Sequence, residues 1–171
     1  PRLITTIDPT IQRQVEAEAS QALTHWSEDG AEQVAVIVTR TDTGEVLAWI
    51  GSGGYFAKGT GAIDFAQTER SPGSTLKPFI YALALDRGAI APETRLLDTA
   101  FTAGTMANSD RGFLGALTPR QALANSRNVP AANLTKAIGL DETFLYLHLL
   151  GLHQSEHPAE YYGLSMSVGA L

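Results

Sequence analysis

The segment at residues 70–80 constrains the fold of this chain most, because it places a serine and a lysine three positions apart at the start of an apolar helix. Its sequence is Arg-Ser-Pro-Gly-Ser-Thr-Leu-Lys-Pro-Phe-Ile. The apolar residues recur at helical spacing, namely Phe79, Ile80, Leu83 and Ala84. Pro78 must lie in the first turn, since proline deeper inside would break the helix, and Gly88 ends it. Ser74 and Lys77 are therefore predicted on one helix face, one turn apart.

The pairing of Ser74 with Lys77 indicates nucleophilic chemistry. A hydroxyl is a weak nucleophile until a neighbouring base takes its proton, and an amine one turn away can do so. The N-terminus of a helix also favours negative charge, which would stabilise an oxyanion formed at an acylated Ser74. A second motif, Ser126-Arg127-Asn128, lies farther along the chain in a loop between two predicted helices. Ser-x-x-Lys followed by Ser-x-Asn is the order used by enzymes that carry an acyl group on serine.

The first 50 residues predict a helix followed by a hairpin. Asp8-Pro9 is typical of a helix cap followed by proline in the first turn, and Gly30 ends the helix. One helix face is expected to carry the apolar residues Ile11, Val15, Ala19, Ala22 and Trp26. Segments 34–39 and 45–50 are apolar and β-branched, and the Asp-Thr-Gly between them predicts an antiparallel turn. A helix followed by a hairpin indicates an α+β fold.

The rest of the chain predicts mainly helices, which begin at Thr118-Pro119 and span 129–138 and 142–150. We interpret 98–115 as an irregular connection and 153–171 as a loop-like tail, so the middle of the chain is expected to be an all-helical subdomain. The glycines within 51–61 are not followed by a helix that carries Lys-Ser/Thr, which argues against a phosphate loop and favours a surface loop. Large side chains expected in the core are Trp26, Trp49, Leu145, Leu147, Leu149, Leu150 and Leu152.

Composition argues against several classes of function. The 171 residues carry a net charge of −6 and no basic stripe, which argues against nucleic acid as a partner. No apolar run of about 18 residues is present, and the first residues lack the apolar region of a signal peptide. His153 and His157 have a spacing that suits metal ligands on a helix, but Pro158 argues against a helix there. We expect no metal and no cofactor.

Together, these motifs resemble the transpeptidase domain of class A penicillin-binding proteins, the bifunctional peptidoglycan synthases. Residues 70–78 are similar to the nucleophile segment of that family. Residues 118–128, Thr-Pro-Arg-Gln-Ala-Leu-Ala-Asn-Ser-Arg-Asn, are similar to its second motif and the helix before it. Residues 5–8 and 162–170 are similar to the start of the domain and to the approach to the helix that precedes the third motif. Segment 71–77 is most like the penicillin-binding protein 1C subgroup.

The resemblance implies a fold and a role for each motif residue. The fold is α+β, that of serine β-lactamases and penicillin-binding transpeptidases, with an antiparallel sheet and an all-helical subdomain. Ser74 would be the nucleophile, and Lys77 its general base, which requires that burial or positive neighbours lower the pKa of the amine. Ser126 would relay a proton to the leaving group. Asn128 would hold the peptide carbonyl of the substrate and orient Lys77.

The resemblance also implies a reaction and a location. The reaction is D,D-transpeptidation, in which serine attacks the D-Ala-D-Ala bond of a peptidoglycan stem peptide, D-Ala leaves, and the acyl group passes to an amine of a neighbouring stem. β-Lactam antibiotics would acylate Ser74 as substrate mimics. The implied location is the periplasmic face of the inner membrane, with the membrane reached only through an N-terminal anchor that precedes these residues.

The third motif of the family, Lys-Thr-Gly or Lys-Ser-Gly, does not occur in this sequence. Among its lysines, Lys58 begins Lys58-Gly59-Thr60, which has the wrong order. We therefore expect residues 1–171 to be the N-terminal part of a transpeptidase domain, without its C-terminal half, the glycosyltransferase domain and the membrane anchor. The hairpin at 34–50 then has an open edge, which we expect to pair with the missing C-terminal half or with a second copy.

Two alternative functions stay open. One is a penicillin-binding sensor domain that keeps the serine but does not turn over. The other is a serine β-lactamase, which is less favoured because the middle residue of the second motif is Arg127 and no deacylating glutamate is identified.

Overall fold

The computed structural model describes residues 2–56, 60–104 and 106–171, so Lys58 and Gly59 lie outside the described residues. The chain divides after Arg70 into two compact units, which are described separately as the N-terminal unit and the C-terminal unit. No helix in the described ranges is both long and apolar enough to cross a membrane.

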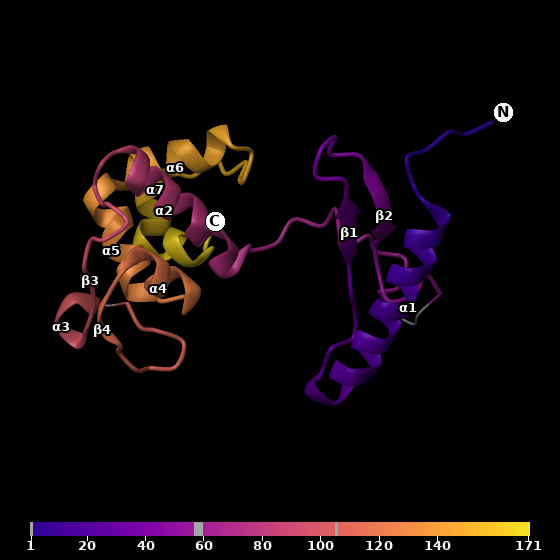
Figure 1. The fold of residues 1–171 in the computed structure, drawn as a ribbon, viewed down its shortest axis with the longest axis horizontal. Coiled ribbons are helices and arrows are strands. Elements are labelled where there is room, and N and C mark those ends of the chain that lie inside the picture. Colours follow the sequence, from indigo (N-terminus) through magenta and orange to yellow (C-terminus); the bar gives the residue numbers. More distant parts are fainter. Residues whose placement is uncertain (1, 57–59, 105) are drawn as a thin grey trace. The chain divides into compact units, whose positions relative to one another are not determined.

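The N-terminal unit consists of a helix packed beside a hairpin (Figure 1). Helix α1 spans Pro9–Trp26, and a short 3-10 turn, Ser27–Asp29, follows it. The Asp8 carboxylate accepts hydrogen bonds from the first free amides of the helix, as predicted for a capping residue. Strands β1, Val36–Thr39, and β2, Val46–Ile50, pair antiparallel, with Val36 opposite Ile50. The predicted helix and hairpin are confirmed.

The packed face of α1 differs from the prediction at its C-terminal end. Ala19 is buried, but Ala22 is exposed and Trp26 is 54% exposed, so Trp26 is not a core anchor. The step of three from Ala19 to Ala22 leaves the packed face, which instead continues to the half-buried Leu23 four positions on. Trp49 on β2 is half-buried, and its indole donates to Asp64.

The C-terminal unit is built on helices α2, α4, α5 and α6 (Figure 1). Its elements are the 3-10 turn η2 (Gly73–Leu76), α2 (Lys77–Asp86), β3 (Leu96–Asp98), α3 (Ala100–Ala103), β4 (Gly115–Leu117), α4 (Pro119–Ala124), α5 (Asn128–Ile138), α6 (Leu140–Leu149), α7 (Ala159–Tyr162) and the 3-10 segment η3 (Gly163–Val168). Helix α5 contacts α2, α6 and η3. The core of the unit comprises Ile80, Tyr81, Ala84, Ile90, Leu117, Ala122, Ala131 and Leu134.

Two segments interpreted as irregular contain regular structure, and those two predictions are wrong. Strands β3 and β4, at the two ends of the 98–115 connection, pair antiparallel with Leu96 opposite Leu117. Strands of three residues are too short for an alternating pattern to reveal them. The tail begins with a loop at 153–158 but then forms α7 and η3. The subdomain expected to be all-helical is therefore mainly helical, with a small second sheet.

The leucines of α6 and the segment after it are only partly in the core. Leu147 is fully buried and Leu152 is half-buried, but Leu145 and Leu150 are exposed and Leu149 is 74% exposed. The helix packs through the face that carries Thr143 and Leu147, four residues apart, and the other leucines point away from that face. The prediction that these leucines lie in the core is therefore right for Leu147 and wrong for Leu145, Leu149 and Leu150.

Candidate active site

The nucleophile candidate Ser74 lies in the 3-10 turn that leads directly into α2. Lys77 is the first residue of α2, and its backbone amide donates to the Ser74 carbonyl, which places the two residues one turn apart. Pro78 occupies the first turn of the helix, as predicted. Leu76 is buried and anchors the turn in the core, whereas the side chain of Ser74 is exposed. Within the described ranges, no hydrogen-bond partner occupies the Ser74 hydroxyl.

The amine of Lys77 is directed into the loop that carries the second motif. Lys77 is only 1% exposed, and its Nζ donates to the backbone carbonyl of Ser126. The same Nζ lies 3.1 Å from Ser126 Oγ and 2.6 Å from Asn128 Oδ1. Of the four residues predicted for the site, the structure therefore joins three directly through one nitrogen, with Ser74 one turn before that lysine.

The surroundings of Lys77 favour its neutral form. Burial is the larger cause and the nearby positive charge of Arg127 the smaller, and together they lower the pKa of Lys77 from 10.5 to about 8. At neutral pH roughly a tenth of the amines are then uncharged, compared with less than a thousandth for a free lysine. A neutral amine has a lone pair that can take a proton from a hydroxyl, which is what a general base requires.

The Ser126–Asn128 loop has an unusual backbone. Helix α4 begins with Thr118 and Gln121 in a reciprocal capping arrangement and ends at Ala124. Ser126 then has a φ of 50°, in the left-handed region that residues other than glycine rarely adopt. This turn leads immediately into α5, which begins at Asn128, so the loop lies between two helices as predicted.

Sequence reasoning missed the residues that anchor this loop from its other side. Arg127 is 5% exposed, and its Nε donates to the fully buried Asp98 at 2.7 Å. The Asp98 carboxylate also accepts from Asn108 Nδ2 at 2.7 Å and from the amide of Leu114. The only signal in the sequence is an aspartate directly after an apolar pair, Leu96-Leu97, and such an aspartate is as typical of a surface turn as of a buried ion pair.

The nucleophile segment also contacts the η3 end of the chain. The Ser71 hydroxyl donates to the Gly169 carbonyl, and a Cβ added to Gly169 would overlap the backbone of Gly73. Gly169 has a φ of 89°, so both its conformation and its surroundings require glycine. The backbone of the turn that carries Ser74 thus packs directly against the backbone at Gly169, with no room for a side chain between them.

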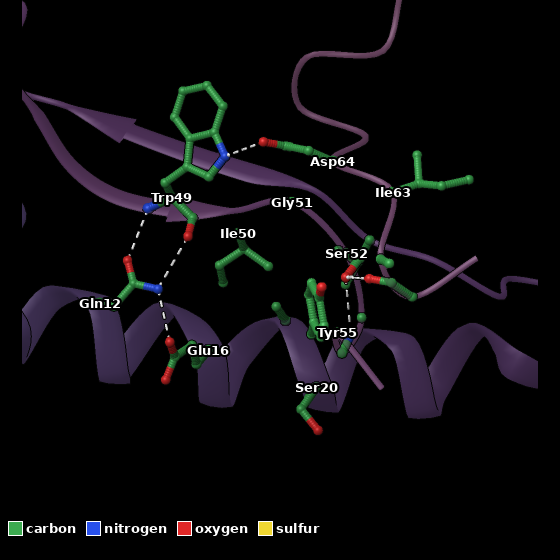
Figure 2. Close-up of a pocket in the computed structure, with 16 residues that line it drawn as sticks. Gln12, Glu16, Ser20, Trp49, Ile50, Gly51, Ser52, Tyr55, Ile63 and Asp64 are labelled. Carbon is green, nitrogen blue, oxygen red and sulfur yellow. Dashed lines mark hydrogen bonds between the residues drawn. The ribbon is translucent and has the colours of Figure 1, made fainter. Parts of the chain in front are cut away.

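A separate pocket of about 580 Å³ lies within the N-terminal unit, among α1, β2 and the segment after β2 (Figure 2). Figure 2 shows that several of its polar groups are paired with one another. The side chain of Gln12 bridges the Trp49 backbone and the Glu16 carboxylate, and Asp64 accepts from the Trp49 indole. Both carboxylates among the described lining residues, Glu16 and Asp64, therefore already have hydrogen-bond partners.

The histidines of the C-terminal unit make structural contacts. His153 is buried, its Nε2 lies 3.0 Å from the Phe144 carbonyl, and its Nδ1 accepts from the amide of Ser155. His157 stacks on Tyr161. Across the described parts of the chain, no group of three or more metal-ligating side chains gathers.

Comparisons with known proteins agree with this geometry. Residues 34–167 match the family profile of the penicillin binding protein transpeptidase domain. Penicillin-binding protein 1C of Escherichia coli K12 is 34% identical over 154 residues, covering 88% of this chain and 20% of that protein. Penicillin-binding protein 1A of Neisseria flavescens is 35% identical over 147 residues, which cover 81% of this chain and 18% of that protein. The structure of the penicillin-binding protein PonA1 from Mycobacterium tuberculosis has a TM-score of 0.67 at 26% identity, covering 90% of this chain and 39% of that one.

The chain therefore belongs to the penicillin-binding protein transpeptidase family. The relatives named 1C and 1A confirm the predicted resemblance to class A members, and the structural likeness confirms the predicted fold class. The chain spans about a fifth of the length of the curated relatives it matches.

Proposed function

We propose that this chain supplies the nucleophile side of a peptidoglycan D,D-transpeptidase site, with Ser74 as the acylated residue. The observation that carries the proposal is the buried Lys77 amine, one turn from an exposed serine and held by Ser126 and Asn128. Burial and Arg127 lower the pKa of this amine to about 8, which suits a base that works near neutral pH.

The proposed acylation follows from the positions of these groups. Ser74 Oγ attacks the carbonyl carbon of the penultimate D-Ala while its proton passes to the neutral Lys77 Nζ. The C–N bond then breaks, and the proton reaches the leaving nitrogen of the terminal D-Ala through the Ser126 hydroxyl, which lies 3.1 Å from Nζ. The amine of a second stem peptide then attacks the ester carbonyl and forms the new amide bond. The C–O bond to Ser74 breaks, and the proton lost by the amine passes through the same pair of groups to Ser74 Oγ.

In this proposal Asn128 has two roles. Its Oδ1 accepts from Lys77 Nζ, while its Nδ2 donates to the Ala107 carbonyl, so the orientation of the amide is fixed. It thereby keeps the amine beside the turn that carries Ser74. Holding the peptide carbonyl of the substrate would require Nδ2 to exchange the Ala107 carbonyl for the substrate.

The proposed partners and setting follow from the same function. Stem peptides and β-lactams would both present a carbonyl carbon to Ser74, and the reaction would take place outside the cytoplasm, where peptidoglycan lies. We further propose that residues 1–171 form the N-terminal part of the transpeptidase domain, and that a Lys-Thr/Ser-Gly strand in the full gene product completes the site.

The proposal is tested by acylation of the full gene product with a fluorescent penicillin. We expect one covalent label per chain, mapped by peptide mass to Ser74, and no label in the Ser74→Ala variant. The matched control is Ser20→Ala on the exposed surface of α1, which should be labelled as fast as the unsubstituted protein. A label on another residue, or an equal label in Ser74→Ala, would contradict the proposal.

Two further measurements separate the transpeptidase from its alternatives. Stable labelling together with cross-linking of lipid-linked peptidoglycan supports the transpeptidase. Stable labelling without cross-linking indicates a sensor domain, and release of the label within seconds indicates a β-lactamase.

A further inference from the structure

The side chain of Arg127 extends from the Ser126–Asn128 loop to the β3–β4 region, and each nitrogen of its guanidinium donates a hydrogen bond. Nε donates to Asp98, Nη1 to Asp110 at 2.8 Å, and Nη2 to the carbonyl of Gly112. A planar guanidinium can make such a set of contacts at once because its donors are fixed in one plane. The middle residue of the second motif is therefore fastened to the β3–β4 region by three hydrogen bonds.

Asn108, which is also buried, provides a second attachment by hydrogen bonding to the start of α5. The N-cap position of α5 is Arg127, whose side chain does not cap the helix. Instead, Asn108 Oδ1 accepts from the amides of Asn128 at 2.8 Å and Val129 at 3.3 Å. An oxygen that receives the first free amides of a helix acts as a cap, here supplied from a distant segment.

Asp98 accepts hydrogen bonds from both Asn108 and Arg127. One carboxylate oxygen accepts from Asn108 and the other from Arg127, and the residue is fully buried at the end of β3. Without the Asp98 charge, the buried Arg127 would keep only the exposed Asp110 as a carboxylate partner, and weakening a buried ion pair in this way is unfavourable. Asp98 therefore holds both the guanidinium that anchors the middle of the loop and the amide that caps α5.

We infer that Asp98, acting through Arg127 and Asn108, is a positioning residue that holds the Ser126–Asn128 loop in reach of Lys77. The inference rests on the proposed function. The loop needs such a device because Ser126 has a left-handed backbone that costs free energy, so the loop keeps this shape only when its surroundings fix it. Lys77 holds the loop from one side, and Asp98 holds it from the other.

The consequence for catalysis is geometric. If the loop relaxes, Ser126 Oγ and Asn128 Oδ1 no longer stay at 3.1 Å and 2.6 Å from Lys77 Nζ. A displacement of about 1 Å in a reacting constellation can cost roughly 100-fold in rate. In the proposed function, binding before acylation uses only the Asn128 amide of this loop, whereas acylation needs the Ser126 and Asn128 oxygens at Lys77 together, so the acylation step should suffer more.

The test compares Asp98→Asn with Asp86→Asn in the full gene product. Asp98→Asn keeps the size of the side chain but removes its charge. Asp86→Asn is the matched control, because the ion pair of Asp86 within the described part of the chain is an exposed one with Arg87. Stopped-flow labelling with a fluorescent penicillin gives the first-order acylation constant and the dissociation constant of the complex that precedes it.

We expect Asp98→Asn to lower the acylation constant at least tenfold while the dissociation constant changes less than threefold. Asp86→Asn should leave both within twofold of the unsubstituted protein. A folded Asp98→Asn variant that acylates within threefold of Asp86→Asn overturns the inference, and so does an equal loss in both constants. No label at Ser74 in the unsubstituted protein would overturn the proposed function and this inference with it, which is a distinguishable result.

Arg127→Lys carries the test if Asp98→Asn does not fold. Lysine keeps the positive charge near Lys77, but a single nitrogen cannot reach Asp98, Asp110 and the Gly112 carbonyl together. The same tenfold loss in the acylation constant is expected. If neither variant folds, Asp98 and Arg127 serve the stability of the unit, and the positioning role is rejected.

Discussion

At the scale of single residues, the proposed role of Lys77 as the base rests on two effects of its surroundings. Burial disfavours the charged amine, and the three acceptor oxygens on Ser126 and Asn128 hold it in place. A neutral amine can donate two hydrogens to these acceptors and still keep a lone pair. In that neutral form the nitrogen keeps two of its three contacts and has a lone pair for the proposed transfer of the Ser74 proton.

The pH dependence of acylation follows from the pKa of Lys77. Since this pKa is lowered to about 8, the rate of Ser74 acylation should rise about tenfold per pH unit below pH 7 and level off above pH 8.5 or so. The measurement is the second-order labelling rate with a fluorescent penicillin from pH 5.5 to 9.5. Lys77→Arg should abolish acylation across the whole range, because a guanidinium stays charged. A flat profile, or a rise centred above pH 10, would count against Lys77 as the base.

At the scale of elements, the packing of the turn that carries Ser74 against the η3 end depends on a close approach of two glycines. Gly169 approaches the backbone of Gly73, directly before Ser74, and Ser71 donates to the Gly169 carbonyl. Backbone cannot move aside as a flexible side chain can, so a single methyl group here must displace one segment or the other.

Gly169→Ala should both destabilise the chain and slow acylation of Ser74. The positive φ alone costs about 1 kcal/mol for alanine, and the overlap with Gly73 should add about 1–3 kcal/mol. Gly88→Ala is the matched control, because Gly88 also has a positive φ, 66°, but nothing lies within 4 Å of an added Cβ. Urea unfolding and penicillin labelling of both variants make the check, and only Gly169→Ala should lose labelling rate, by tenfold or more. Equal effects of the two substitutions would mean that the close approach does not matter for the site.

The sequence predicted the elements whose signals are local. Asp8-Pro9 marked the start of α1, the Asp-Thr-Gly turn marked the β1–β2 hairpin, and Pro78 placed Ser74 at a helix start. Each of these features involves neighbours within a few residues. The 3-10 form of the Ser74 turn was not predicted, since it differs from an α-helical turn only in its hydrogen-bond spacing.

The sequence could not predict the parts of the site that depend on distant contacts. Asp98 is 29 positions from Arg127 and Asn108 is 20 from Asn128, and no periodic pattern links them. The three-residue strands that bring Asp98 to the loop have no sequence signature of their own. The lowered pKa of Lys77 likewise depends on burial, which only the packed structure supplies.

At the scale of the whole molecule, the β1–β2 hairpin has unpaired backbone edges, as the shorter β3–β4 pair also does among the described residues. In the described residues β1 pairs with β2 alone, so each strand has one free edge. A two-stranded sheet is marginally stable by itself, and free edges favour pairing with another chain. We therefore propose that this edge pairs with the C-terminal half of the domain in the full gene product, or with a second copy when the 171 residues stand alone.

The 171-residue chain should accordingly self-associate in sedimentation velocity experiments at micromolar concentration. Ile37→Lys places a charge on β1, where the side chain is already exposed, and should shift the chain toward monomer. Thr41→Lys, in the turn between the strands, adds the same charge away from the edge and should not. A well-ordered monomer at all concentrations would show that the edge needs no partner.

The left-handed backbone of Ser126 sets a limit on how stable this loop can become. Glycine would adopt that conformation without strain, but it has no hydroxyl to place beside Lys77. Any residue that relieves the strain at this position removes the proposed proton carrier as well. The backbone strain at Ser126 is thus the cost of keeping a hydroxyl beside Lys77, and the proposed proton transfer cannot be had without it.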